Sequence, residues 1–357
     1  MKQLLVVGGV LALAACTKVE GTSTTRGARK VAEPSRPSGI EKLVRDLETC
    51  SLEGYQITAT CPAMETLAAE LRQPGTAHEI SVALGRTLLA DRAPAVRIEA
   101  ATLLGADAPS RDAIVDAARY ETDVRVREAM IRVIASDGAR FPRVGAFLLE
   151  STQFPVPGIR AQALDALTRP ASRALPGAAV RVLAMAEGDP DPALRRAACA
   201  SGGKLGDPVF LPFYERVTSS AEDPELYAAC LEGVVAMFHN EPAFDTASEG
   251  AYHLFLRRIE AQPAKAPWQV MSAFCNDNPD ASTHRAPWFD VHEVTSALRA
   301  VVAERGASWQ ARSAAIESMV GLGANKAELT ALAQGYTARD GSDKVVLDKL
   351  LAESDRL

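Results

Sequence analysis

The sequence predicts an all-α protein in which helical hairpins stack into an α-α superhelix, and three observations lead to this prediction. Among 357 residues there are 64 alanines, whereas aromatic residues make up only 5%, a composition that favours closely packed helices over sheets. Helices with the same apolar pattern recur every 30 to 35 residues, and a second helix fits into each interval. Because one hairpin cannot bury its apolar face alone, successive hairpins are expected to stack.

The charge balance excludes one class of partner. Lysine and arginine total 39 against 45 aspartate and glutamate residues, which gives a net charge of -6. Nucleic-acid-binding domains normally carry an excess of basic residues, so we expect no nucleic-acid partner. The length permits one elongated domain or two compact ones.

Residues 1–15 have the pattern of an export signal. Met1 and Lys2 precede an apolar run over residues 3–15, which is shorter than the roughly 20 residues that a membrane-spanning helix needs but matches a signal-peptide core. The run ends in the sequence Leu-Ala-Ala-Cys at residues 13–16. This segment resembles the lipobox of bacterial lipoproteins. An ordinary secretory signal followed by a chance cysteine is the alternative.

The lipoprotein resemblance implies a covalent lipid on Cys16 and no other cofactor. It implies diacylglyceryl transfer to the Cys16 thiol, cleavage before this residue, and acylation of the new amine. Two or three acyl chains anchor a protein stably, so the mature chain needs no transmembrane helix. Thr17 and Lys18 follow, and the lack of aspartate there resembles lipoproteins of the outer membrane. We therefore expect a protein of the bacterial cell envelope, at the outer membrane and facing the periplasm.

The next two segments are predicted as a tether and a cap. Residues 16–39 contain mainly Ser, Thr, Gly, Pro and charged residues and are expected to form a flexible tether. Residues 40–76 are expected to form an N-terminal capping helical hairpin. We predict a disulfide between Cys50 and Cys61 that clasps the neck of this hairpin, because export leads to an oxidising compartment. Closing so short a loop contributes roughly 3 kcal/mol on the entropic model.

Three further cysteines are predicted to stay unpaired. Once Cys16 is set aside, five cysteines remain, so at least one has no partner within the chain. Cys199, Cys230 and Cys275 each lie in an apolar helical stretch. Neighbouring helix axes are about 8–10 Å apart, which is beyond the reach of most disulfides. We therefore expect three buried free thiols.

Residues 77–235 contain the regular repeats. Each copy opens with an apolar residue followed by arginine, and apolar residues recur at i, i+4, i+7 and i+8, which is one face of a helix. The arginines are Arg97, Arg127, Arg160 and Arg195. Second helices are expected at residues 110–120, 142–151, 176–187 and 207–217.

The repeat segments resemble a known family. DVRVREAMIRVIASDG and DPDPALRRAACASGGKLGDP are similar to HEAT repeats of the short bacterial type found in phycobilisome lyases. The resemblance covers residues 77–235 and returns at residues 309–323, so that residues 236–357 are read as irregular and C-terminal HEAT-like repeats. It implies a HEAT-like α-solenoid in which the four arginines brace loops against acidic residues such as Asp91, Asp123 and Asp191.

The irregular stretch at residues 236–308 is the candidate recognition surface. Of the 19 aromatic residues, 13 lie between Phe210 and Trp309, and aromatic residues are enriched at the centres of protein interfaces. The alternative is that these rings fill the core of longer helices. The candidate partner-binding residues are Tyr252, His253, Trp268, Trp288 and Phe289.

No catalytic or metal-binding constellation is predicted. His284, Asp290, His292 and Glu293 could offer ligands, but their spacing matches no recognised metal motif. The chain has no glycine-rich phosphate loop and no recognisable nucleophile motif.

We therefore expect a lipid-anchored, non-catalytic protein–protein interaction scaffold whose partner is an envelope or periplasmic protein. The alternatives are a binder of a small ligand, a glycan or a metal through residues 236–308, or a HEAT-type lyase-like enzyme.

Overall fold

The computed structural model describes residues 46, 50–72, 76–220, 222–239, 246–275 and 286–357. The predicted signal peptide, the tether, Cys16 and most of the first arm of the N-terminal hairpin lie outside these residues. The described chain is predominantly helical, which confirms the all-α class. Its strands are the short pair β1 (Leu52–Glu53) and β2 (Gln56–Ile57).

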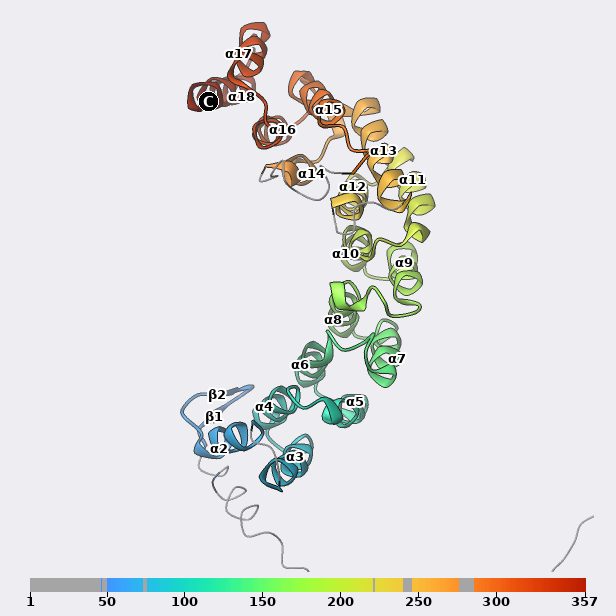
Figure 1. Ribbon diagram of the computed structural model, residues 1–357, viewed down its shortest axis with the longest axis vertical. Coiled ribbons are helices and arrows are strands. Elements are labelled where there is room, and N and C mark those ends of the chain that lie inside the picture. The colour runs from blue at the N-terminus through green and yellow to red at the C-terminus, as the bar shows by residue number, and fades with distance from the viewer. Residues whose placement is uncertain (1–45, 47–49, 73–75, 221, 240–245, 276–285) are drawn as a thin grey trace, which may run out of the picture.

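The helices form two layers along a curved, elongated body (Figure 1). After α2 (Pro62–Glu70), the outer, convex layer contains α3 (Thr76–Leu88), α5 (Arg111–Tyr120), α7 (Pro142–Ser151), α9 (Ala178–Gly188), α11 (Leu211–Ser220), α13 (Thr246–Ala261) and α15 (Val291–Ala303). The inner, concave layer contains α4 (Pro94–Leu104), α6 (Val124–Ile134), α8 (Pro157–Leu167), α10 (Pro192–Gly202), α12 (Pro224–His239), α14 (Trp268–Met271) and α16 (Trp309–Gly321). The chain ends with α17 (Lys326–Gly335) and α18 (Gly341–Arg356).

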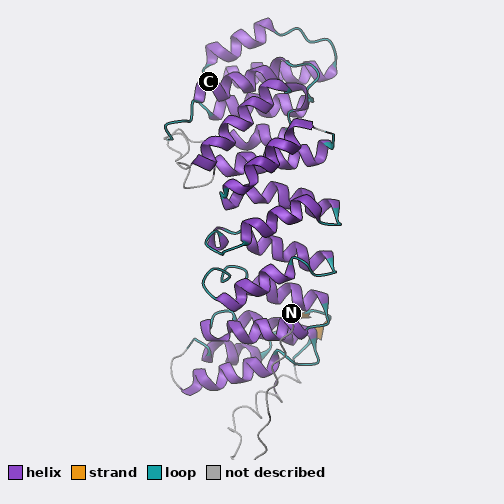
Figure 2. Ribbon diagram, turned by 90° about the vertical axis from the view of Figure 1, so that its right-hand side faces the viewer, coloured by secondary structure: helices purple, strands orange, loops and turns teal. Residues whose placement is uncertain are grey.

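Helices that are two elements apart in the sequence pack side by side. Among the inner helices, α4 contacts α6, α6 contacts α8, α8 contacts α10, and α10 contacts α12. Figure 2 shows that the helices lie across the long axis of the body, one above another. The apolar positions that the repeat predicts are buried between the layers, for example Val96, Met130 and Ile159. They belong to one hydrophobic cluster that runs from Cys61 to Leu350.

The inner helices begin where the sequence provides a suitable first turn. Proline occupies the first helical position of α4, α8 and α10, where its missing N–H costs nothing because that group has no helical partner. Asp123 caps α6 by accepting hydrogen bonds from the backbone N–H groups of Arg125 and Val126. Asp191 caps α10 in the same way through Ala193.

An arginine links each of two inner helices to the loop before the next one; Arg160 is buried and Arg97 is half-buried. The Arg97 Nε lies 2.7 Å from Glu121, and the Arg160 guanidinium contacts both carboxylate oxygens of Asp189 at 2.8 and 2.9 Å. Each arginine also donates to backbone carbonyls just before its own helix. Because both Arg160 and Asp189 are almost completely buried, this pair is held in fixed geometry.

The acidic partners differ from those that the resemblance implies. Glu121 and Asp189 lie two residues before the N-caps Asp123 and Asp191, and their carboxylates also accept the backbone N–H of these caps. The predicted partners Asp123 and Asp191 serve as caps instead. Val156 is the N-cap of α8, and Phe154 lies two residues before it. The Arg127 guanidinium lies 4.3 Å from the centre of the Phe154 ring. An aromatic ring therefore takes the place of the carboxylate at this junction.

The predicted disulfide between Cys50 and Cys61 is present, with its Cα atoms 5.1 Å apart. The loop that it closes is an antiparallel β-hairpin in which Leu52 pairs with Ile57. Gly54 has a φ of 57° at the turn, a conformation that glycine adopts without strain. The disulfide therefore closes a β-hairpin that leads into α2. Of the predicted helical hairpin, the second helix corresponds to α2, and most of the first lies outside the described residues.

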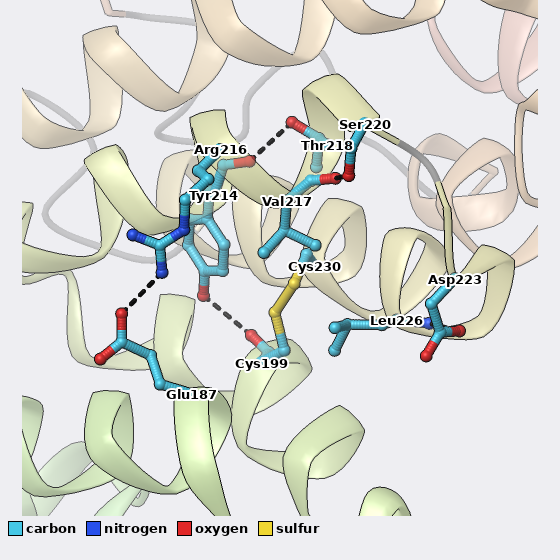
Figure 3. Close-up of a disulfide and its surroundings, with 10 residues drawn as sticks. All are labelled: Glu187, Cys199, Tyr214, Arg216, Val217, Thr218, Ser220, Asp223, Leu226 and Cys230. Carbon is cyan, nitrogen blue, oxygen red and sulfur yellow. Dashed lines mark hydrogen bonds and ion pairs between the residues drawn. A yellow bond between two sulfur atoms is a disulfide. The ribbon is translucent and has the colours of Figure 1, made fainter.

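The prediction of free thiols at Cys199 and Cys230 is wrong, because these residues form a second disulfide. It joins the inner helices α10 and α12, with the Cα atoms 4.9 Å apart (Figure 3). The helices approach this closely because small residues face each other. A Cβ on Gly203 would clash with the Gly233 carbonyl oxygen, and a Cβ on Gly233 would clash with the Cys199 carbonyl oxygen. The usual helix spacing assumes larger side chains at the contact. Cys275 remains a free thiol.

Replacing Arg160 by alanine should destabilise the chain strongly, because the Asp189 carboxylate would stay buried without a cation. Removing one partner of a buried ion pair typically costs about 3–5 kcal/mol. The control is Arg169→Ala, which removes an exposed ion pair with Asp165 that is worth about 0–1 kcal/mol. Urea unfolding followed by circular dichroism compares the two variants. Equal midpoints would contradict the role that we assign to the buried pair.

Candidate interaction surface

The five predicted partner-binding residues do not form one surface. Tyr252 is completely buried on α13. The centre of its ring lies 5.3 Å from that of Trp288 and 5.4 Å from that of Phe289. Its hydroxyl accepts a hydrogen bond from the backbone N–H of Asp290 at 3.1 Å and donates to the Glu293 carboxylate at 3.0 Å. Tyr252 therefore connects α13 to the first turn of α15, and burial raises the pKa of its hydroxyl.

Most of the aromatic residues in this region belong to the core. Phe238 lies at the centre of a cluster, with ring centres 5.9 Å from Tyr252, 5.7 Å from Phe255 and 6.2 Å from Phe274. Phe289 is buried and Trp288 is half-buried. The alternative that aromatic rings fill longer helices is correct for these residues, since α12 and α13 are each 16 residues long.

His253 and Trp268 are the two predicted residues that reach the surface, and they lie on different layers. His253 is exposed on the outer helix α13, whereas Trp268 opens the inner helix α14 with 51% of its surface exposed. Sequence reasoning missed Trp309, which opens the next inner helix α16 and is 43% exposed.

The concave surface of the N-terminal half carries charges of both signs. The exposed face of α6 presents Arg125, Glu128 and Arg132, which are spaced three and four residues apart and so share one side of the helix. Further along, Arg196 of α10 lies 2.8 Å from Glu225 of α12. Basic and acidic side chains therefore alternate along this part of the surface.

The disulfide-closed β-hairpin covers the first part of this concave surface. The Tyr55 hydroxyl donates to the Asp123 carboxylate at 2.9 Å, and the Arg125 guanidinium lies 4.9 Å from the centre of the Tyr55 ring. The hydrogen bond to Asp123 raises the pKa of Tyr55. Figure 1 shows β1 and β2 on the concave side of α4. The hairpin thus packs against the concave side of the first inner helices.

Two grooves open on the same rim of the body, two repeats apart. A groove of about 610 Å³ lies between the ends of α3 and α5 and is lined by Asp91, Asp116 and the highly exposed Tyr120. The equivalent groove of about 330 Å³ is lined by Gln153 and Arg181. The arginines that pair with the loop carboxylates line these grooves, Arg97 the first and Arg160 the second.

Metal-binding clusters and reactive thiols are the two features that would indicate chemistry among the ionisable groups of the described residues. Within them, no group of three or more His, Cys, Asp or Glu side chains could hold a metal ion. The free thiol of Cys275 lies 3.4 Å from the Ser318 hydroxyl, and burial raises its pKa, which disfavours the reactive thiolate. On the concave helix α12, burial likewise raises the pKa of the Glu232 carboxyl.

Comparison with known proteins identified no family for this chain, because no protein-family model and no curated protein matches it. In the part of the chain that the structure describes, no helix is both long and apolar enough to cross a membrane.

Replacing Tyr252 by phenylalanine should destabilise the chain, because the ring stays in place while the backbone N–H of Asp290 loses its acceptor. The loss of an intramolecular hydrogen bond typically costs about 0.5–1.5 kcal/mol. Thermal unfolding measures the effect. The neighbouring exposed residue serves as control, since His253→Ala should change the free energy of unfolding by less than about 0.5 kcal/mol. A larger decrease in the free energy of unfolding for His253→Ala than for Tyr252→Phe would contradict the structural role that we assign to Tyr252.

Proposed function

We propose that this chain is a lipid-anchored HEAT-like α-solenoid of the bacterial cell envelope, which acts as a non-catalytic scaffold for an envelope or periplasmic protein. The observation that carries the proposal is the unbroken series of inner helices, which presents one long concave surface with charges of both signs. Repeat proteins use such extended surfaces for binding.

Three features support the HEAT-like class. Helical pairs recur every 30 to 35 residues, an arginine stands near the start of the inner helix of each regular repeat, and each inner helix packs on the next. The arginines at the junctions act between one repeat and the following one, which is where a solenoid must be stabilised because its repeats touch only their neighbours.

Two features support the cell envelope. The segment at residues 13–16 has the order of a lipobox and follows a short apolar run. The disulfides Cys50–Cys61 and Cys199–Cys230 are stable in an oxidising compartment such as the periplasm and are rare in the cytosol. The anchor would be the lipid on Cys16, and the tether at residues 16–39 would separate the solenoid from the membrane.

The anchor can be tested by changing the cysteine that would carry the lipid. We expect the Cys16→Ser variant to fold but to leave the membrane fraction, because the acyl chains supply the membrane affinity. Cys275→Ser is the matched control, since it removes the free thiol and should stay in the membrane. The readout is the distribution of each variant between the membrane pellet and the soluble fraction. Persistence of Cys16→Ser in the pellet would refute the lipid anchor.

The scaffold function can be tested by reversing charges on the concave surface. The protein partner is crosslinked in the envelope and identified by mass spectrometry. We expect the amount of crosslinked partner to fall at least tenfold in the Arg125→Glu/Arg132→Glu variant. Arg143→Glu is the control, because this arginine is similarly exposed but lies on the outer helix α7. A partner that is retained by the concave variant and lost by the outer variant would place the binding surface on the convex side.

A further inference from the structure

The first groove on the rim carries an aromatic ring and two carboxylates. It lies between the ends of α3 and α5, and its volume of about 610 Å³ makes it the larger of the two equivalent grooves. Asp91 follows α3, whereas Asp116 and Tyr120 are four residues apart on α5 and so share one side of that helix. Tyr120 is 86% exposed, although tyrosine side chains are usually at least partly buried.

The two carboxylates retain unused acceptor positions. Asp91 forms no ion pair with any described residue, and its Oδ1 accepts the backbone N–H of Ala93 at 2.8 Å. The Asp116 Oδ1 accepts a hydrogen bond from Arg143, and its other oxygen has no donor among the described residues. Because an ionised carboxylate can accept about four hydrogen bonds, both groups can bind a further cation.

The arginines that line the same groove are already engaged. Arg97 holds the Glu121 carboxylate through contacts at 2.7 and 3.1 Å. Arg86 donates to the Pro109 carbonyl at 3.3 Å, just before the first turn of α5. Tyr120 is the last residue of this 10-residue helix, which is about 15 Å long. The end of the groove beside Tyr120 therefore keeps negative charge that the groove's own arginines do not neutralise.

The C-terminal part of the chain shows what a tyrosine and a carboxylate can bind together. The Arg305 guanidinium lies 5.5 Å from the centre of the Tyr336 ring and 2.8 Å from the Asp343 carboxylate. Guanidinium groups stack on aromatic rings and pair with carboxylates through their planar set of donors. The groove beside Tyr120 offers a ring and carboxylates without an arginine between them.

The equivalent groove two repeats later lacks these features. Positions are counted back from the carboxylate that pairs with the arginine lining each groove. Tyr120 then corresponds to Gly188. Asp116 corresponds to Ala184, and the second groove is also lined by Arg181. The two grooves share their architecture and differ in the groups that would recognise a cation, so the second groove serves as an internal control.

We propose that the groove beside Tyr120 binds an arginine side chain of the envelope or periplasmic partner. The guanidinium stacks on the Tyr120 ring and donates to the carboxylates of Asp91 and Asp116. The methylene groups of the arginine lie on Leu89 and Ala117, which line the groove, because long basic side chains cover apolar surface while their charged ends stay polar. The inference rests on the proposed scaffold function and names the chemistry that the partner presents.

A capped tripeptide tests this groove without the partner. The protein is the full chain with Cys16→Ser, isotope-labelled at its six tyrosines. The peptide acetyl-Gly-Arg-Gly-amide is titrated while the tyrosine ring signals are followed by NMR. We expect a saturable shift of the Tyr120 signal and an unchanged Tyr55 signal. Citrulline has the shape of arginine without its charge, so its peptide should bind at least about tenfold more weakly, since charge-assisted hydrogen bonds are the stronger ones.

Variants of the groove test the roles of its carboxylates. Asp91→Asn/Asp116→Asn should weaken binding of the arginine peptide about tenfold, because two partly exposed ion pairs are lost. Asparagine keeps an acceptor for the backbone N–H of Ala93, so the fold should be retained. Arg143→Ala should strengthen binding, because it frees the Asp116 carboxylate. The matched control is Arg181→Ala, which changes the equivalent groove and should leave the affinity unchanged.

Several outcomes would overturn the proposal. The site is wrong if no saturable Tyr120 shift occurs, or if the arginine and citrulline peptides bind equally. Unchanged affinity in Asp91→Asn/Asp116→Asn with native circular dichroism would also exclude it. Sedimentation velocity tests a second copy as the occupant: self-association of the Cys16→Ser chain that is lost in this variant would overturn a different protein as the source of the arginine. Crosslinking of a partner in the envelope is a separate result, so failure of the scaffold function and failure of this groove are distinguishable.

Discussion

The stacking of the repeats depends on arginines that reach from one inner helix to the loop before the next. Arg97 and Arg160 each pair with a carboxylate two residues before a helix cap, and that carboxylate also binds the backbone N–H of the cap. One side chain thereby sets both the start of the following helix and its distance from the preceding one. Breaking the buried pair of Arg160 and Asp189 would leave an uncompensated charge, so this contact favours one arrangement of the two repeats that it joins.

The junction between α10 and α12 uses close packing in place of an ion pair. Gly203 and Gly233 let the two helix backbones touch, and this contact brings Cys199 and Cys230 within disulfide distance. The Tyr214 hydroxyl of α11 donates to the Cys199 carbonyl oxygen at 2.8 Å (Figure 3), so the outer layer is tied to the same point. Here Ser201 and Gly202 interrupt the apolar pattern of the regular repeats, and a covalent bond supplies the stability that apolar side chains provide elsewhere.

The two ends of the body differ in which side chains they leave exposed. At the N-terminal end, the hairpin covers the start of the concave surface through Tyr55, Asp123 and Arg125. Toward the C-terminal end, Trp268 and Trp309 are exposed at the starts of α14 and α16. The aromatic residues between them in sequence are mainly core residues that hold the long helices α12 and α13 against α15. The aromatic residues that distinguish this stretch of the sequence therefore serve mainly to pack long helices against one another.

The sequence alone determined the helical class, the period of the repeat, the buried face of each regular helix and the Cys50–Cys61 pair, because these depend on local periodicity and short-range spacing. The features that depend on how closely two helices approach each other were decided by the tertiary structure. The Cys199–Cys230 disulfide required two facing glycines on different helices, and the burial of Tyr252 required α15 to cover it. The exchange of a carboxylate for the Phe154 ring at one junction likewise became apparent only when the helices were placed side by side. Side-chain contacts between elements more than 25 residues apart leave no periodic mark in a single sequence.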